Sequence, residues 1–269
     1  MSAANLQTSS DQLSQTSIDT AIILAAGMGT RIDCLHTDQP KGFIKIGGLT
    51  LIEHSIKLLQ TYGIRRIILV TGAYGWAYQA FAAHCPIVQC VENMAFATTG
   101  NMASLMCALP YIDGDFLLLE SDLLYESRAL SAVLNHPARD VVLASEPTAA
   151  TDEVWVEAHA GCLLGLSKTR TELGSVTGEF VGIVKVSSDL AQRLRSSFDV
   201  FVQRYGHAYM HYDTGGLAVV AKEYPISVAM VPDLLWGEVD YPFHYQRLCT
   251  HVWPAIQASL KKPAPALPL

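Results

Sequence analysis

The chain of 269 residues lacks several features that mark common classes of protein. No apolar run approaches the ~18 to 20 residues of a membrane span, so no membrane-spanning segment is expected. Lys and Arg form no cluster, and the net charge of −7 argues against a nucleic-acid-binding surface. The six cysteines form no C-x-x-C pair and lie among apolar residues, which favours reduced thiols over disulfides or zinc ligands. We therefore expect a cytoplasmic protein that binds no nucleic acid.

The two ends of the chain lack the pattern of a packed structure. Residues 1–18 are rich in Ser, Thr, Gln and Asn and have no basic or apolar region of a secretory signal. We expect them to form a disordered leader. Residues 256–269 include the string KKPAPALPL, whose prolines forbid a helix, and predict a flexible tail. Residues 19–255 are then expected to form a single domain.

The segment AIILAAGMGTRIDCLHTDQPK lacks the two most common glycine-rich nucleotide motifs. It has no Gly-Lys-Ser/Thr, which a Walker-type loop requires. Gly27 and Gly29 supply only the first two glycines of G-x-G-x-x-G, since Ile32 stands where the third belongs. A bare G-x-G can be a plain tight turn. However, a loop without bulky side chains lets backbone N–H groups approach a triphosphate, and Arg31 and Lys41 supply positive charge for it.

Strand-like and helix-like segments alternate along the first part of the chain. Expected strands are 21–24, 43–46, 66–71, 87–92, 115–120 and 141–145, and expected helices are 51–62, 74–84, 102–108 and 127–135. Buried strands separated by amphipathic helices predict an α/β fold with a mostly parallel sheet and helices on both faces. After about residue 150, a hairpin (154–158 with 162–167) and a strand at 179–186 predict a smaller antiparallel part.

Two acidic residues follow an apolar strand at Glu120-Ser121-Asp122. Strand geometry sends the side chains of Glu120 and Asp122 to the same face. A solvated strand end is one interpretation. The other is a magnesium site at Asp122, because Mg²⁺ is bound by a few carboxylates together with phosphate oxygens and waters.

The loop after the first strand resembles that of the nucleoside-triphosphate transferases, which join a nucleoside monophosphate to a phosphorylated small molecule. Their signature is L-A-A-G-x-G-[TS]-R followed, ten residues after the arginine, by the lysine of P-K, and Arg31 and Lys41 keep this spacing. The resemblance implies a Rossmann-like fold of the nucleotide-diphospho-sugar transferase type. Its nucleotide-binding half would span about 19–150 and its acceptor-side half about 151–255. It also implies that the nucleotide contacts Leu24, Ala25, Ala26, Gly27, Gly29 and Thr30.

The same resemblance implies catalytic and metal-binding roles. Arg31 would stabilise the leaving pyrophosphate, and Lys41 the charge of the α-phosphate. Asp122 matches the second acid of the family's D-x-D or E-x-D, and Asp240 the first aspartate of its E-[IV]-D segment. Both are therefore expected to bind Mg²⁺, although an acidic turn before a helix would also explain Asp240. The family's later acid is replaced by His244.

Two further strings narrow the expected substrates. The string N-x-x-[YF]-x-x-[TS]-x-N-x-x-S-L, typical of members that use cytidine nucleotides, is matched at Asn93, Thr99, Asn101 and Ser104; helix capping is the alternative role. The segment around Lys168 and GEFVGIVK resembles cytidylyltransferases that act on phosphonates. The acceptor-binding residues that this implies are Lys168, Glu179, Lys185, Tyr212, Asp213 and Trp236.

The sequence thus favours a Mg²⁺-dependent cytidylyltransferase that transfers CMP from CTP to a small phosphonate or phosphate ester and releases pyrophosphate. 2-Aminoethylphosphonate is the preferred acceptor and phosphocholine the next. One alternative is a sugar-1-phosphate nucleotidyltransferase that uses UTP, GTP or dTTP. Another is a nucleotide-binding module without enzymatic activity. The sequence leaves open whether the protein forms a homodimer.

Overall fold

The computed structural model describes residues 18–32 and 39–261. The predicted leader, except for Ile18, lies outside the described residues, as does Cys34. The five cysteines within them, at positions 85, 90, 107, 162 and 249, are free. Across both described ranges, no helix combines the length and the apolar character that crossing a membrane requires.

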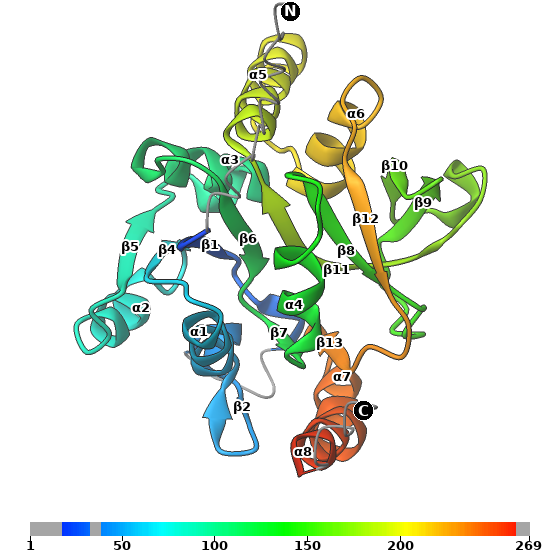
Figure 1. The fold of residues 1–269 in the computed structure, drawn as a ribbon. Coiled ribbons are helices and arrows are strands. Elements are labelled where there is room, and N and C mark those ends of the chain that lie inside the picture. Colours follow the sequence, from blue (N-terminus) through cyan, green and yellow to red (C-terminus); the bar gives the residue numbers. More distant parts are fainter. Residues whose placement is uncertain (1–17, 33–38, 262–269) are drawn as a thin grey trace, which may run out of the picture.

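A nine-stranded sheet runs through the described part of the chain (Figure 1). Its strands pair in the order β5 (Val88–Glu92), β4 (Arg66–Thr71), β1 (Thr20–Ala25), β6 (Phe116–Glu120), β11 (Gly178–Val186), β8 (Val141–Ser145), β12 (Ser227–Val231), β10 (Cys162–Ser167) and β9 (Trp155–His159). Pairing is parallel from β5 to β6 and between β8 and β12, and antiparallel on both sides of β11 and β10. The predicted α/β class is confirmed, but the sheet is mixed rather than mostly parallel.

Side chains of the central strand β1 alternate between two hydrophobic cores, as strand geometry requires. Ile22 and Leu24 pack in one core with Met102 and Leu105 of helix α3 (Asn101–Ala108), whereas Ile23 packs in the other. Every residue of β1 is buried, which explains why the strand reads as a continuous apolar run. The strand therefore ends between two packed layers, and the loop that follows it is held at a fixed place.

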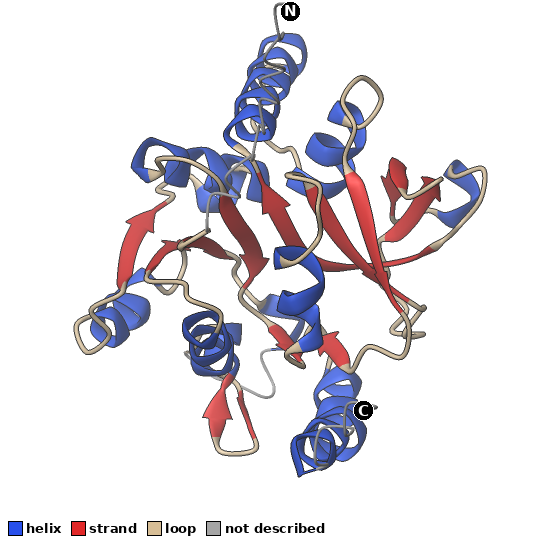
Figure 2. Ribbon diagram, viewed as in Figure 1, coloured by secondary structure: helices blue, strands red, loops and turns tan. Residues whose placement is uncertain are grey.

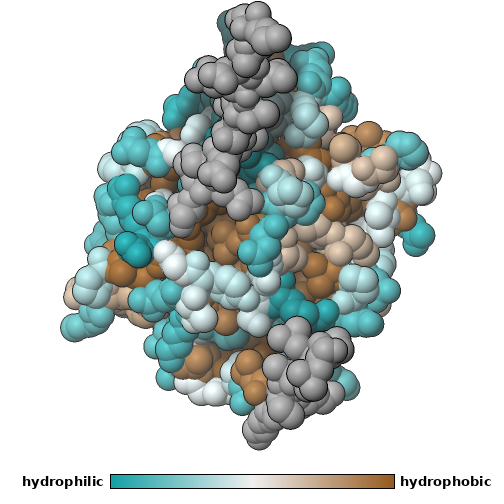
Figure 3. All heavy atoms as spheres, in the orientation of Figure 1, coloured by the Kyte–Doolittle hydropathy of each residue, from teal (hydrophilic) through white to brown (hydrophobic). Residues whose placement is uncertain are grey.

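Helices cover both faces of the sheet (Figure 2). Helices α1 (Leu51–Thr61), α2 (Gly75–Ala82) and α4 (Arg128–Leu134) contribute to one core, and α3 (Asn101–Ala108), α5 (Ser188–Tyr205) and the short α6 (Ala218–Val220) to the other. On the face drawn in Figure 3, hydrophilic residues gather over α5, and hydrophobic residues show near the centre, over the sheet. The layered arrangement predicted from the alternating pattern is confirmed.

Three expectations about individual segments are corrected. The predicted strand at 43–46 is instead a 3₁₀ turn, Lys41–Phe43, followed by a separate hairpin of β2 (Lys45–Ile46) and β3 (Leu49–Thr50). Gly47 and Gly48 form its turn with positive φ angles, which glycine adopts without strain. The hairpin β9–β10 belongs to the large sheet and is not a separate antiparallel lobe, because β9 pairs with β11 as well as with β10.

The third correction concerns the C-terminus. Helices α7 (Pro242–Arg247) and α8 (Trp253–Lys261) follow a small antiparallel pair of β7 (Leu123–Tyr125) and β13 (Trp236–Glu238). Helix α8 takes in six residues that the sequence assigned to the flexible tail, and Ile256 is buried in a third hydrophobic cluster. The remainder of the predicted tail lies outside the described residues. The closing helices thus anchor the segment that carries Glu238 and Asp240.

Candidate active site

A pocket of about 390 Å³ opens where strands β1 and β6 end. This is the edge at which α/β sheets commonly bind ligands, and its volume lies in the range of small-molecule sites. Of the residues that the sequence singled out, the pocket is lined by Leu24, Ala25, Ala26, Gly27, Gly29, Arg31, Lys41, Thr99, Asn101, Ser104, Asp122, Lys168, Glu179, Asp213, Trp236 and Asp240. Residues more than 200 positions apart are therefore brought together in one cavity.

The loop after β1 forms one wall of this pocket. Gly29 has a φ of +67°, which turns the chain sharply before the 3₁₀ turn Thr30–Ile32. A Cβ added at Gly27 would meet no atom within 4 Å, so the space beside this residue is open. The side chain of Thr30 lies outside the described part of the structure. The loop offers bare backbone to a ligand, as the sequence predicted.

Arg31 and Lys41 converge on the carboxylate of Asp240. The Arg31 Nη2 group donates to Asp240 Oδ1 at 2.9 Å, and the Lys41 ammonium contacts the same oxygen. Lys41 Nζ also lies 3.4 Å from Asp122 Oδ2. Burial alone would raise the pKa of Asp240, but Lys41 and Arg31 outweigh it and the pKa is lowered. The ammonium of Lys41 stands between two carboxylates, which shows that this part of the pocket accommodates a cation.

At three other carboxylates of the pocket, burial and neighbouring negative charges outweigh any compensation. Burial first, and then the charges of Asp122 and Asp213, raise the pKa of Glu120 to about 8. Burial followed by the neighbouring Asp240 raises the pKa of Asp152 to about 6. Burial and the charge of Asp122 raise the pKa of Glu238 well above its ordinary value. The pocket therefore concentrates negative charge that a bound cation would stabilise.

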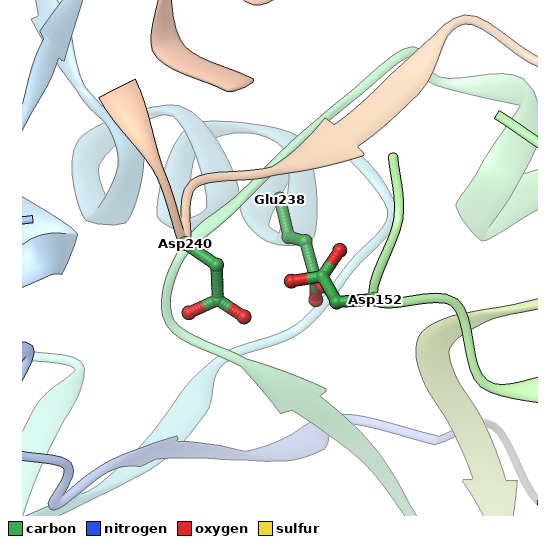
Figure 4. A group of neighbouring side chains, drawn as sticks. All are labelled: Asp152, Glu238 and Asp240. Atoms are coloured by element: carbon green, nitrogen blue, oxygen red, sulfur yellow. The ribbon is translucent and has the colours of Figure 1, made fainter. Parts of the chain in front are cut away.

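Three of these acids form a compact group. Ligand oxygens of Asp152, Glu238 and Asp240 lie within 4.8 Å of one another, and the carboxylates point toward one another (Figure 4). Both carboxylate oxygens of Asp152 are buried without a hydrogen-bond partner among the described residues. An all-oxygen donor set with orphaned carboxylate oxygens suits a hard divalent cation such as Mg²⁺.

The string around helix α3 is organised by Asn93. Its side-chain amide donates to Thr99 Oγ1 at 3.1 Å and to Ser104 Oγ at 3.0 Å. Thr99 and Ser104 line the pocket, whereas the buried Asn93 does not. The N-cap of α3 is Gly100, and its first turn has no side-chain cap. The alternative role of these residues as helix caps is therefore not observed. Instead, the buried Asn93 fixes the side chains of two pocket residues by hydrogen bonds.

The start of α3 is joined to a distant segment, residues 208–213. Gly100 N donates to Ala208 O at 3.1 Å, and Tyr212 N donates to Asn101 Oδ1 at 2.8 Å. A Cβ at Gly100 would lie 2.1 Å from Met210 O, so only glycine allows this close approach. The wall expected to bind nucleotide and the wall expected to bind acceptor are thus parts of one packed unit.

The predicted acceptor residues are only partly brought together. Trp236 lines the pocket and donates from Nε1 to Ser145 Oγ at 2.7 Å, and Glu179 accepts from the backbone N of Thr148. Tyr212 is fully buried and does not line the pocket. The prediction for Lys185 is wrong, because its ammonium donates to the carbonyl of His136 at 2.7 Å, away from the pocket.

Sequence reasoning missed several lining residues. Asp152 lies in the loop before β9, where no motif marks it, and Glu238 was noted only as the neighbour of Asp240. His211, which belongs to no recognised motif, lines the pocket beside Tyr209, with the two ring centres 5.7 Å apart. Long-range packing determines the positions of these residues in the pocket. Among them, only Glu238 belongs to a sequence motif, the E-V-D string, that could have indicated its role.

The raised pKa of Glu120 predicts how stability depends on pH. With a folded pKa of about 8 against an ordinary 4.5, Glu120 is protonated in the folded protein at pH values where the unfolded chain has released the proton. Its contribution to the free energy of unfolding is thus present below about pH 4.5 and is lost as the pH rises toward 8. Burial lowers the pKa of His54, so the contribution of His54 to stability increases as the pH rises. Since this opposes the effect of Glu120, the test compares wild type with a Glu120 variant at each pH.

The measurement is urea unfolding of wild type and Glu120→Gln at pH 5.5 and pH 8.0, with EDTA and with Mg²⁺. In EDTA, wild type is expected to lose stability relative to Glu120→Gln as the pH rises. Mg²⁺ should reduce this loss by offsetting the negative charge. The assignment would be contradicted if the free energy of unfolding of wild type rose relative to that of Glu120→Gln between pH 5.5 and pH 8.0.

Comparison with known proteins agrees with this geometry. Residues 21–261 match the family described as "MobA-like NTP transferase domain". The chain is 28% identical over 240 residues to the CMP-5'-(3-aminopropyl)phosphonate synthase of Streptomyces rubellomurinus, a match that covers 82% of this chain and 37% of that protein. It is also 28% identical to the 2-aminoethylphosphonate cytidylyltransferase of Lancefieldella rimae, over 72% of this chain and 77% of that protein. The chain thus spans little more than a third of the first relative.

Solved structures share the fold. An inositol-1-phosphate CTP transferase from T. maritima superposes with a TM-score of 0.75 at 21% identity, over 92% of this chain and 98% of that one. The CTP:phosphocholine cytidylyltransferase LicC from Streptococcus pneumoniae superposes with a TM-score of 0.68 at 20% identity, over 86% and 98%. At these identities the likeness establishes the fold alone.

Proposed function

Because the chain belongs to the family of MobA-like NTP transferase domains, we propose that it transfers CMP from CTP to a small phosphonate or phosphate ester that carries an ammonium group. One observation carries this proposal. Seven carboxylates line the pocket, against three Lys and Arg side chains. Such a pocket needs positive charge from its ligands, and a metal–nucleotide complex together with an ammonium-bearing acceptor would supply it.

The nucleotide would lie along the loop after β1. The open backbone at Gly27 offers N–H groups to phosphate oxygens, and Arg31 and Lys41 stand at the same edge. Thr99 and Ser104, which Asn93 fixes, offer hydroxyl groups to the base or ribose. Preference for CTP is supported by the cytidine-type string at these positions and by the names of the two relatives from Streptomyces rubellomurinus and Lancefieldella rimae, a CMP-phosphonate synthase and a cytidylyltransferase.

The acceptor would lie against Trp236 and Asp213. An aromatic face together with a carboxylate is the usual environment for an alkylammonium group. Lys168, at the end of β10, supplies a cation for the phosphonate or phosphate end. 2-Aminoethylphosphonate carries both groups and is the preferred acceptor, and phosphocholine is the next.

Catalysis would rest on alignment and charge neutralisation. An acceptor oxygen, already anionic near neutral pH, attacks the α-phosphorus, and pyrophosphate leaves; no protein general base is needed. Lys41 would stabilise charge on the α-phosphate and Arg31 the leaving pyrophosphate. Asp240, Asp122 and the neighbouring acids would hold Mg²⁺, which supplies additional positive charge against the phosphates when bound.

Two other functions remain as outcomes of the test. A sugar 1-phosphate acceptor with UTP, GTP or dTTP would use the same fold, but a neutral sugar leaves Asp213 and Glu120 without compensating charge. A binding module without activity would have little need for the cluster of carboxylates beside Lys41 and Arg31.

The proposal is tested by pyrophosphate release with Mg²⁺, over CTP, UTP, GTP and dTTP against 2-aminoethylphosphonate, phosphocholine, phosphoethanolamine and glucose 1-phosphate. Turnover is expected with CTP and an amine-bearing acceptor. Ethylphosphonate, which lacks the amine, is the matched control. Its kcat/KM should be at least about tenfold lower than that of 2-aminoethylphosphonate. Equal turnover of ethylphosphonate would refute the ammonium site, and turnover confined to glucose 1-phosphate would favour the sugar enzyme.

A further inference from the structure

Asp152 is a carboxylate of the pocket to which no sequence motif gives a role. Its side chain is only 11% exposed, and its two oxygens have no hydrogen-bond donor within the described residues. The Arg31 Nη1 group lies 3.9 Å from Asp152 Oδ2 and the imidazole nitrogen His244 Nε2 lies 3.6 Å from Asp152 Oδ1, both beyond hydrogen-bond distance. A buried carboxylate without donors is costly unless a ligand compensates it.

The chain holds Asp152 in this costly position by a strained loop. Ala149 and Thr151 have φ angles of 57° and 79°, which are unfavourable for residues with a Cβ and most of all for a β-branched one. His244 Nε2 donates to the carbonyl of Ala150 at 2.8 Å, while its Nδ1 accepts from the backbone N of Asp240 at 3.2 Å. One buried imidazole therefore fixes Asp152 and Asp240 relative to each other.

We propose that Asp152 is a direct ligand of the divalent cation, which it holds together with Glu238 and Asp240. The three ligand oxygens lie within 4.8 Å of one another, close enough to surround one ion (Figure 4). Asp152 comes from the loop after β8, and the other two come from the segment at the end of β13. His244 is then a positioning residue that sets the geometry of this group through backbone contacts.

This inference deepens the proposed function, but its test does not depend on turnover. Mn²⁺ alone is titrated into the full chain, and free Mn²⁺ is followed by electron paramagnetic resonance. Asp152→Asn, which keeps the shape of the side chain, is expected to weaken Mn²⁺ binding at least about tenfold. Asp199→Asn, at an exposed position on α5, is the matched control for the loss of one negative charge and should bind as wild type does. Equal binding by Asp152→Asn and wild type, or no binding by wild type, would overturn the inference.

Thermal unfolding separates a metal ligand from a structural residue. In EDTA, Asp152→Asn should be at least as stable as wild type, because it removes a charge that faces Asp240. Addition of Mg²⁺ should then raise the Tm of wild type more than that of the variant. A variant that is less stable than wild type in EDTA would mark Asp152 as structural and overturn the proposal. These tests and the substrate assay can fail separately. Loss of the metal-ligand inference would not change the turnover measured for wild type, and absence of turnover would not change the result of the Mn²⁺ titration.

Discussion

Replacement of Lys41 by alanine is expected to lower kcat for pyrophosphate release by about a hundred- to a thousandfold, the usual cost of removing one preorganised charge at a transition state. Lys41 follows the loop that faces the nucleotide, and its ammonium touches Asp240 and lies 3.4 Å from Asp122. Opposite charges keep the pKa of Lys41 raised despite burial, so the side chain remains cationic at every working pH. The charge is therefore available where phosphate charge develops.

The matched control is Lys45→Ala. Lys45 is exposed on β2, four residues along the chain, and does not line the pocket. It should retain normal kcat and KM, which would show that general loss of positive charge does not explain the effect. Lys41→Met, which keeps most of the side-chain length, separates loss of charge from loss of packing and should be as slow as Lys41→Ala. Near-normal turnover by either Lys41 variant would remove this residue from the proposed chemistry.

Several strands in both halves of the chain were predictable because their signals are local. Strands β4, β8 and β10 have the predicted bounds, since each is a short apolar run between turn residues. Helix α5 was missed although its signal was present. Ser187 caps its start, Leu190 and Leu194 lie one turn apart on its buried face, and Gly206 ends it with a φ of 72°.

The wrong assignment of Lys185 has a geometric cause. Glu179 and Lys185 lie on one strand, and a sequence does not state the direction in which a strand enters a sheet. β11 is antiparallel to β6 and β8, so Glu179 pairs with Ser145 at the end of β8 and Lys185 with Val141 at its start. Only the first of these edges borders the pocket. Asp152 was missed for a related reason, because its place depends on contacts with His244, 92 positions away, which no local pattern reveals.

The second large effect is expected for Gly100→Ala. A Cβ there would lie 2.1 Å from Met210 O and 2.6 Å from Met210 C, and backbone atoms cannot move aside as a flexible side chain can. Residues 208–213 would have to separate from α3, which breaks the bonds from Gly100 N to Ala208 O and from Tyr212 N to Asn101 Oδ1. We expect the free energy of unfolding to fall by about 2 to 3 kcal/mol.

Activity should reveal that the two halves of the site are coupled by this contact. Because His211 and Asp213 line the pocket from the displaced segment, KM for the acceptor is expected to rise in Gly100→Ala.

Gly27→Ala provides the opposite case, since a Cβ at Gly27 meets no atom within 4 Å. It should change the free energy of unfolding by less than about 0.5 kcal/mol. Its KM for CTP should nevertheless rise about tenfold, as expected if phosphate oxygens approach the bare backbone and one hydrogen bond to a charged group is lost. Urea unfolding and initial rates on both variants decide the matter: a stable Gly100→Ala, or a Gly27→Ala with unchanged KM for CTP, would mean that the corresponding glycine is not needed for close approach.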